Sequence, residues 1–426
     1  MKKKQYWFKI DNAGKVFPSI SNQERSNTFR LSMTLKETVD QHILNQAVHM
    51  MLPRFESFAI QIKTGIFWQY FAENHRPFQV QPESAILTKY FHPRHNKGYL
   101  FKIYYFQNRV TLETFHALTD GSGALAFLTS IMYQYLTLLG HDMNPEGKIL
   151  GTQPIQPKEN EDAFITNYDA AYKSSMKETH AFHLSGEKFE HAFTNLFTLK
   201  LDITALKIVA KEKYKMTITQ YIASVICYSI MKQNSHFHQQ KKPLKLFIPI
   251  NLRPYFDAIT LRNFSLYLKT VFNPEDVSLT FEEVTESIKL QFSDQLNKDI
   301  IKKRIAGYVS LEKVWWIRLL PFFLKNIAFK IGYDMLGAKI NTASFSNLGL
   351  VKLPKDMESH IDDVNFIIGG FGFGISAISY QQTMSLNLAT TIKDTSIMKE
   401  VASILHKHGL TLRVISNYKE HYDELL

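Results

Sequence analysis

The sequence of 426 residues contains a single cysteine, Cys227, so no disulfide forms within the chain. Scarce cysteine fits a reducing compartment, and we expect a cytoplasmic protein. Because Cys227 lies in an apolar helical pattern over 218–231, it is expected to be a buried structural thiol. No serine stands in a Gly-x-Ser-x-Gly setting either. The sequence therefore offers no nucleophile of its own.

Metal-binding and phosphate-binding motifs are also missing. There is no His-Glu-x-x-His helix, no cysteine pair beside a histidine pair and no Gly-x-x-x-x-Gly-Lys loop. We predict no metal, no tightly bound cofactor and no nucleotide hydrolysis. The histidines that occur close together are expected to be solvated residues of loops and helix ends. They are His92 with His95, His236 with His238, and His406 with His408.

Acidic residues are the minority among the charges, and the formal net charge is +11. This excess favours an anionic partner. The lysines are scattered, and neither zinc-finger spacing nor an RNA-binding aromatic motif is present, so we expect no nucleic acid. The phosphates of coenzyme A, an acidic carrier protein and anionic lipid remain as alternatives.

No apolar run is long and uninterrupted enough to predict a membrane span. The longest, 314–336, is broken by Arg318, Pro321, Lys325 and Lys330. Either it forms helices packed beside the active site, with its lysines reaching water, or it is an aromatic and basic surface for peripheral membrane contact. The charge pattern leaves both open. The basic N-terminus is not followed by an apolar run, so no secretory signal is expected.

The most informative segment that is present is 115–121, FHALTDG. Aromatic and β-branched residues at 99–106 and 110–116 predict a β-hairpin before it. Apolar residues at helical spacing over 124–136 predict a helix after it. The segment is therefore expected to connect a strand to a helix.

In that connection, His116 leaves the strand and Asp120 caps the helix. Gly121 and Gly123 allow a sharp turn and the close approach of a ligand. A histidine held there can take a proton from a hydroxyl or amine substrate. Without a nucleophile of the protein, this indicates direct transfer between two bound substrates. The alternative is an ordinary turn with a hydrogen-bonded histidine.

The segment HALTDG resembles the His-x-x-x-Asp-Gly motif of the chloramphenicol acetyltransferase-like superfamily. That superfamily includes plant BAHD acyltransferases, condensation domains, wax ester synthases and alcohol acetyltransferases. Three further blocks are similar to its alcohol acetyltransferase-like branch, in the same order, and together the blocks cover most of the chain. They are 44–71, 247–267 and 346–349 with Pro354 soon after.

The resemblance implies an α/β (α+β) fold of two similar subdomains. Each would be a mixed β-sheet flanked by helices, with the active-site channel between them, in a monomer. We expect residues 1–160 to form the subdomain with the motif, 161–190 to cross over, and 191–426 to form the second subdomain.

The resemblance also implies roles for site residues. His116 would be the general base, and Asp120 would support the turn through an arginine, Arg253 or Arg262, between which the sequence does not choose. Gly121 would admit the thioester or pantetheine arm. Residues that could donate to an oxyanion, or equally be bonded to nearby backbone, are Asn263, Ser346 and Asn347.

Two departures from family patterns narrow the expectation. Phe115 stands where condensation domains of peptide synthetases carry a second histidine, which favours ester or simple amide formation. Residues 370–374, GFGFG, lack the aspartate and tryptophan of the plant BAHD motif Asp-Phe-Gly-Trp-Gly, so we interpret them as a β-bulge or closely packed strand.

Our hypothesis from the sequence is an O-acyltransferase that moves an acyl group from a thioester, on coenzyme A or phosphopantetheine, to a small-molecule or lipid alcohol. One alternative is a free-standing condensation enzyme that uses an acyl carrier protein and forms an amide or ester. Another is a non-catalytic scaffold that binds lipid or carrier.

Overall fold

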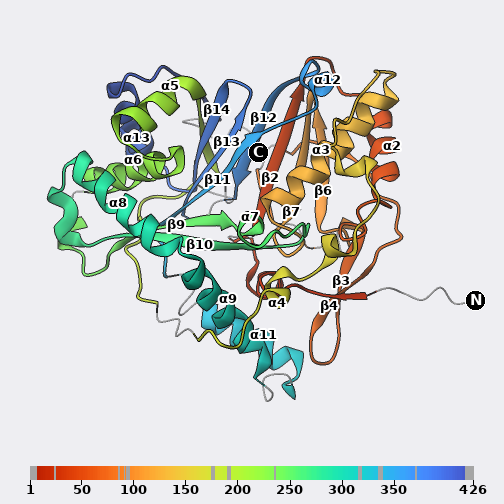
Figure 1. Cartoon of the computed structure of the whole chain (residues 1–426), viewed down its shortest axis with the longest axis horizontal. Helices are drawn as coiled ribbons and strands as arrows, with labels where there is room; N and C mark the ends of the chain where they lie inside the picture. The colour runs from red at the N-terminus through yellow and green to blue at the C-terminus, as the bar shows by residue number, and fades with distance from the viewer. Residues whose placement is uncertain are drawn as a thin grey trace, which may run out of the picture.

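The computed structural model describes residues 7–23, 25–84, 87–90, 92, 96–173, 178–189, 193–234, 237–314, 319–333, 339–369 and 372–417. Two large mixed sheets, each with its own helices, dominate these residues, beside a small three-stranded sheet (Figure 1). The predicted class, α/β with two mixed-sheet halves, is confirmed.

The first half is a five-stranded sheet in the order β12-β2-β7-β6-β5, against which α2 and α3 pack. Alternating strand residues such as Leu31, Ile103 and Leu112 meet the apolar faces of these helices and are fully buried. The elements of this half are β2 (Thr28–Leu35), α2 (Gln41–Met51), β5 (Gln81–Pro82), β6 (Phe101–Phe106), β7 (Arg109–Phe115), α3 (Gly121–Leu138) and β12 (Ile361–Ile368).

The predicted hairpin is confirmed as β6 and β7, which pair antiparallel from Phe101↔Thr114 to Phe106↔Arg109. Gln107 and Asn108 form the turn, with Gln107 at a φ of 50°. A left-handed residue of this kind matches the twist of the two strands in a tight hairpin. The hairpin delivers His116 to the end of β7.

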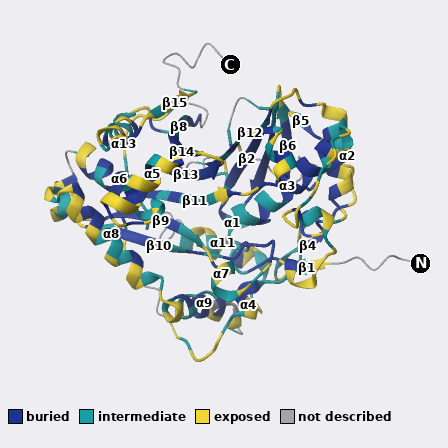
Figure 2. Cartoon of the chain, turned by 45° about the horizontal axis from the view of Figure 1, so that its top comes forward, coloured by how far each residue is buried: buried dark blue, intermediate teal, exposed yellow. Residues whose placement is uncertain are grey.

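The second half is a seven-stranded sheet in the order β10-β9-β11-β13-β14-β8-β15, with α6, α8 and α13 in its apolar core. Figure 2 shows buried strands at the centre of both halves and exposed helix faces outside them. The elements are β8 (Asn195–Asp202), α5 (Ile203–Lys207), α6 (Ile218–Gln233), β9 (Leu244–Asn251), β10 (Ser265–Phe272), α8 (Phe281–Gln295), β11 (Ala343–Val351), β13 (Phe373–Tyr380), β14 (Thr383–Thr390), α13 (Ser396–Lys407) and β15 (Leu412–Ser416).

Cys227 lies on α6 and is fully buried, as predicted. Burial raises the pKa of its thiol to about 12, and its Sγ lies 3.3 Å from Thr270 Oγ1. A thiol with so high a pKa is protonated at neutral pH and is a poor nucleophile.

After β10 the chain forms two successive helices, α8 and α9 (Lys298–Lys313). Asn297 ends the continuity because its side chain accepts a hydrogen bond from Asp299 N and caps α9. Asparagine favours this position since its side chain competes with helical hydrogen bonding.

The strand β12 belongs by sequence to the predicted second subdomain, 191–426, but it pairs with β2 of the first. Figure 1 shows β12, in blue, beside β2, in red. The predicted boundaries at 160 and 190 therefore do not separate the two sheets completely, because β12 follows both boundaries in sequence and completes the sheet of the first half. The division into 1–160, 161–190 and 191–426 otherwise stays a prediction.

Smaller elements fill the lower part of Figure 1, where α4, α9 and α11 lie near the three-stranded sheet β1-β4-β3. Residues 315–318 and 334–336 of the predicted apolar segment are outside the described residues. Among the described helices, none combines the length and apolar character that a membrane crossing requires. The short elements, of which α12 lies at the top of Figure 1, are β1 (Trp7–Lys9), α1 (Phe17–Ile20), β3 (Ile60–Thr64), β4 (Gln69–Glu73), α4 (Ala163–Thr166), α7 (Arg253–Phe256), α11 (Phe322–Gly332) and α12 (Lys355–Glu358).

Candidate active site

The turn between β7 and α3 has the form that the sequence predicts. His116 follows β7 directly, and its backbone N–H donates to Asn27 O at 2.9 Å. Asp120 is the N-cap of α3, and its side chain accepts from Gly123 N at 3.2 Å. The histidine and the aspartate are thus fixed at adjoining ends of a strand and a helix.

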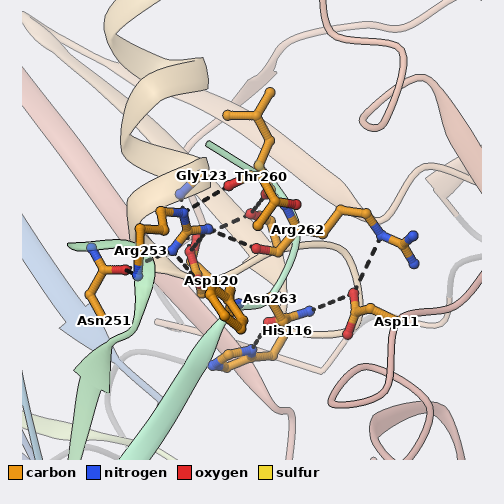
Figure 3. A network of polar contacts seen from close by, with 12 residues as sticks. Asp11, His116, Asp120, Gly123, Asn251, Arg253, Thr260, Arg262 and Asn263 are labelled. Atoms are coloured by element: carbon orange, nitrogen blue, oxygen red, sulfur yellow. Dashed lines mark hydrogen bonds and ion pairs between the residues drawn. The ribbon is translucent and has the colours of Figure 1, made fainter. Parts of the chain in front are cut away.

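Asp120 is held from the other half of the protein by Arg253, at the start of α7. The guanidinium donates to both carboxylate oxygens, at 2.8 and 3.0 Å, and Phe264 N donates to the same carboxylate at 3.0 Å (Figure 3). Asp120 is almost fully buried. Burial alone would raise its pKa, but the Arg253 charge and these hydrogen bonds outweigh it and hold the pKa below its usual value.

The contact with Asp120 identifies Arg253 as the arginine that supports the turn between β7 and α3. Arg262, the other candidate, points away from Asp120 and toward Asp11, with Nε 3.6 Å from Asp11 Oδ2 (Figure 3). It also donates to the carbonyls of Lys9 and Asn160. Arg253 is therefore the partner of Asp120, and Arg262 supports a different part of the site.

Glycine at 123 is required by the same contact between the halves. A Cβ there would lie 2.2 Å from Leu261 O and 2.2 Å from Thr119 Oγ1. Any side chain at this position would push the 251–264 loop away from the turn. At Gly121 a Cβ would instead meet the end of the Leu348 side chain, at 2.6 Å, so Gly121 faces β11. Its predicted part in admitting a thioester stays a prediction.

Asn263 joins His116 to a residue that the sequence did not single out, Asp11. Asn263 Oδ1 lies 3.0 Å from His116 Nδ1, and Asn263 Nδ2 donates to Asp11 Oδ2 at 3.2 Å (Figure 3). An ionised carboxylate only accepts, so the amide NH₂ must face Asp11 and the amide oxygen must face the imidazole. This orientation assigns the proton to Nδ1 and leaves Nε2 of His116 as the acceptor.

The ionisation of Asp11 supports that assignment at neutral pH. Burial raises its pKa to about 6, against the opposing effects of Arg262 and the hydrogen bonds from Gly14 and Asn263. At pH 7 the carboxylate is therefore the main form. Locally, Asp11 resembles a simple turn residue because its Oδ1 accepts from Gly14 N. No signal in the sequence separates it from other such aspartates.

The imidazole of His116 packs against two aromatic rings, and the residue as a whole is partly accessible. Phe17 stacks on it with centroids 4.7 Å apart, and Phe29 meets it edge-on at 5.3 Å. Burial lowers the pKa of His116, although its own backbone, Asp120 and Asn263 act in the opposite direction. His116 is thus neutral at physiological pH, the form that a general base needs.

The three residues predicted as oxyanion donors lie in different surroundings. Asn263 reaches His116, but both ends of its amide already have protein partners, so the geometry favours positioning over oxyanion binding. Asn347 donates to Thr219 Oγ1 at 3.1 Å and accepts from Gly349 N at 2.8 Å, so it stabilises an irregular stretch of β11. Ser346 lies on the face of β11 opposite buried Phe345 and two residues before Leu348, which contacts Gly121.

No group of three or more metal-ligating side chains gathers within the described residues. The glycine-rich segment 370–374 is described only from Gly372, since 370 and 371 lie outside the described residues. Gly374 is in β13, where a Cβ would lie 3.3 Å from Ile368 Cγ1. This agrees with the predicted closely packed strand.

Comparisons with known proteins place the fold. No family profile and no curated protein matches the sequence. Solved structures match along nearly its whole length. The F. graminearum TRI101, solved with coenzyme A and T-2 mycotoxin, has a TM-score of 0.61 at 10% identity over 96% of this chain and 99% of that one. The trichothecene 15-O-acetyltransferase TRI3 of Fusarium sporotrichioides has a TM-score of 0.60 at 9% identity over 95% of each chain.

A third similar structure is the starter condensation domain of rhizomide synthetase RzmA, solved with C8-CoA. Its TM-score is 0.60 at 9% identity over 94% of each chain. The chain has the chloramphenicol acetyltransferase-like fold. At such low identities the likeness establishes the fold alone. Within this fold, His116 lies where the two halves meet.

The buried ion pair between the halves makes a prediction for stability. Asp120→Asn keeps an N-cap side chain but leaves the Arg253 charge uncompensated, so we expect the free energy of unfolding to fall by about 3 kcal/mol or more. Chemical denaturation at pH 7 measures it. Asp202→Asn is the matched control, because Asp202 caps α5 at an exposed site and accepts from Ala205 N. We expect it to change stability by about 0.5 kcal/mol or less. Equal losses in the two variants would contradict a clamp.

The contact with Asn263 makes a prediction for the imidazole. Asn263→Leu removes the acceptor from Nδ1–H, so His116 should pass from one tautomer to a mixture of both. The ¹⁵N shifts of His116, assigned with His116→Ala, report the tautomer. Asn234→Leu is the control, because Asn234 ends α6 and bonds Ile230 O. An unchanged tautomer in Asn263→Leu would disprove the assignment.

Proposed function

We propose that the protein is an acyltransferase that moves an acyl group from an acyl thioester to a hydroxyl acceptor by direct transfer, with His116 as general base. One observation carries this proposal. His116 is a neutral imidazole whose Nδ1 is occupied by Asn263, so its Nε2 is the basic nitrogen. A proton acceptor with a fixed tautomer is what the activation of a hydroxyl requires.

The reaction follows from that geometry. Nε2 takes the proton of the acceptor hydroxyl while its oxygen attacks the thioester carbonyl carbon. The resulting imidazolium keeps its Nδ1–H on Asn263 Oδ1, and the Asp11 carboxylate beyond Asn263 favours the positive charge. When the tetrahedral intermediate collapses, the C–S bond breaks and the thiolate leaves with the proton from Nε2. Ester and free thiol are the products.

Asp120 acts in this scheme without touching substrate. Its two carboxylate oxygens are taken up by Arg253, Phe264 N and Gly123 N. Its part is to hold the turn that presents His116. Ser346 is the oxyanion donor that we propose, because it lies two residues before Leu348, which packs against Gly121 of the turn, and because Asn347 has protein partners.

The donor that we propose is an acyl-CoA, used as a co-substrate and not as a bound cofactor. Two structures of similar fold were solved with coenzyme A or C8-CoA, and one of these also held T-2 mycotoxin. A small-molecule or lipid alcohol would be the acceptor, and Phe115, in place of a second histidine, agrees with ester formation. We further propose that the protein acts as a monomer in the cytoplasm.

Thiol release tests the activity directly. Wild-type protein is assayed with acetyl-CoA and longer acyl-CoA donors against a panel of alcohols and amines. We expect release that requires an acceptor, and His116→Ala should lower kcat by roughly a hundredfold or more. His42→Ala, an exposed histidine on α2, is the matched control and should keep full activity. Full activity in His116→Ala would overturn the mechanism.

The same assay separates the alternatives. Release from an acyl-pantetheine carrier but from no acyl-CoA would indicate the free-standing condensation enzyme, whose fold the condensation domain of RzmA shares. Release from neither donor would indicate a binding scaffold. Product analysis by mass spectrometry distinguishes ester from amide.

The lowered pKa of His116 predicts the pH profile of kcat/KM. The base must be unprotonated, and because its pKa lies below the usual 6.5, the acid limb of the profile should also lie below pH 6.5. Asp11, with a pKa of about 6, titrates in the same range. The variant Asp11→Asn removes that second group. An acid limb that persists in Asp11→Asn belongs to His116, whereas a limb lost in it would contradict the assignment.

A further inference from the structure

The helix α11 exposes its apolar residues and buries a charged one, the reverse of the arrangement that water favours. Its exposed apolar side chains recur at helical spacing on one face, with exposed fractions of 63% for Phe323, 53% for Ile327 and 52% for Ile331. Lys325, in contrast, is 3% exposed. A surface helix with this inversion needs an apolar environment on its outer face.

The buried lysine fixes α11 to the turn of the β3–β4 hairpin. Lys325 Nζ donates to Phe67 O at 2.9 Å and lies 3.6 Å from the centroid of the Trp68 ring. Phe322 N donates to Ile66 O at 2.7 Å. The hairpin turn adds two exposed apolar residues, since Ile66 is 77% and Phe67 45% exposed. Helix and hairpin thus form one continuous surface.

We call this surface the apolar patch. It comprises the exposed apolar residues of the hairpin turn, of α11 and of the segment just before α11. They are Ile66, Phe67, Leu319, Phe323, Leu324, Ile327 and Ile331.

The two chain segments that form the apolar patch carry charges of one sign. Residues 60–72 and 314–333 contain no aspartate or glutamate, whereas Lys63 and Lys330 are exposed within them. Basic residues beside exposed Phe, Ile and Leu complement anionic lipid headgroups above an apolar interior. A second copy of the patch would instead bring like charges together, because a two-fold dimer apposes identical surfaces.

The length of α11 decides how such a contact would be made. Its 11 residues, at 1.5 Å of rise each, span roughly 16 Å, about half of a bilayer's hydrocarbon core. It is too short to cross and would lie along the surface with its apolar face down. α11 also contacts α1, and Phe17 of α1 stacks on His116. The short helix α1 therefore connects the patch to the site.

We infer that the apolar patch docks the protein on anionic membrane surfaces. The phosphate headgroups would be met by Lys63 and Lys330, and the apolar side chains of α11 and the hairpin turn would enter the region beneath them. Docking does not depend on acyl transfer, so the two proposals can fail separately.

Vesicle co-sedimentation of the full chain tests docking. The probes are vesicles of phosphatidylcholine alone and of phosphatidylcholine with about a third phosphatidylglycerol. We expect binding to the anionic vesicles that weakens as salt is raised, and at least about tenfold weaker binding of Phe323→Ser/Ile327→Ser. Lys63→Glu/Lys330→Glu should lose the preference for anionic vesicles.

The matched control is Leu290→Ser/Ile208→Ser, which removes two exposed apolar residues that do not belong to the patch, with exposed fractions of 66% and 50%. This control should bind vesicles like wild type. In the control and in Phe323→Ser/Ile327→Ser, the melting temperature and the rate of thiol release with a water-soluble alcohol should equal those of wild type. Failure of wild type to bind anionic vesicles, or equal binding by Phe323→Ser/Ile327→Ser, would overturn the inference. So would a dimer of the wild type that this variant abolishes, since the patch would then be an interface between copies.

Discussion

The ion pair between Asp120 and Arg253 is the interaction on which the arrangement of the site depends. It joins the N-cap of α3 in one half to Arg253 of α7, which follows β9 of the other half, and it buries Asp120 almost fully and Arg253 in part. Removing two charges from water is costly, and only good geometry with further hydrogen bonds offsets that cost. Both conditions are met, because the pairing is bidentate and Phe264 N and Gly123 N donate further hydrogen bonds to the Asp120 carboxylate. The pair therefore specifies one docking position for the two halves.

That position has a chemical result, because Arg253 also fixes the loop that carries Asn263. Its guanidinium donates to the carbonyls of Thr260 and Arg262, so the backbone just before Asn263 is set by the same side chain that holds Asp120. The imidazole of His116 is then oriented by an amide from the opposite half. One arginine thus links the shape of the molecule to the protonation state of its candidate base.

Local features of the site were predictable from the sequence, and long-range ones were not. The hairpin, the Asp120 cap and buried Cys227 follow from residues close together in the chain. The choice of Arg253 over Arg262 and the contact with Asp11 depend on segments more than a hundred residues apart, for which one sequence gives no register. Whether the apolar segment 314–336 is packed against the protein or exposed was equally undecided from the sequence, because periodicity reveals a stripe of apolar residues but not what covers it. On α11 that stripe faces outward.

The placement of β12 has a consequence for how the protein is made. During synthesis β2 and β7 emerge early, but the other neighbour of β2 lies at 361–368, so β2 remains an open edge until most of the chain has left the ribosome. Open edges of apolar strands recruit other strands, and long sequence separations slow folding. A fragment that ends before β12 would keep that edge permanently. Residues 28–138 thus form a continuous stretch of sequence that cannot complete its own sheet, and the edge of β2 stays unpaired until β12 arrives.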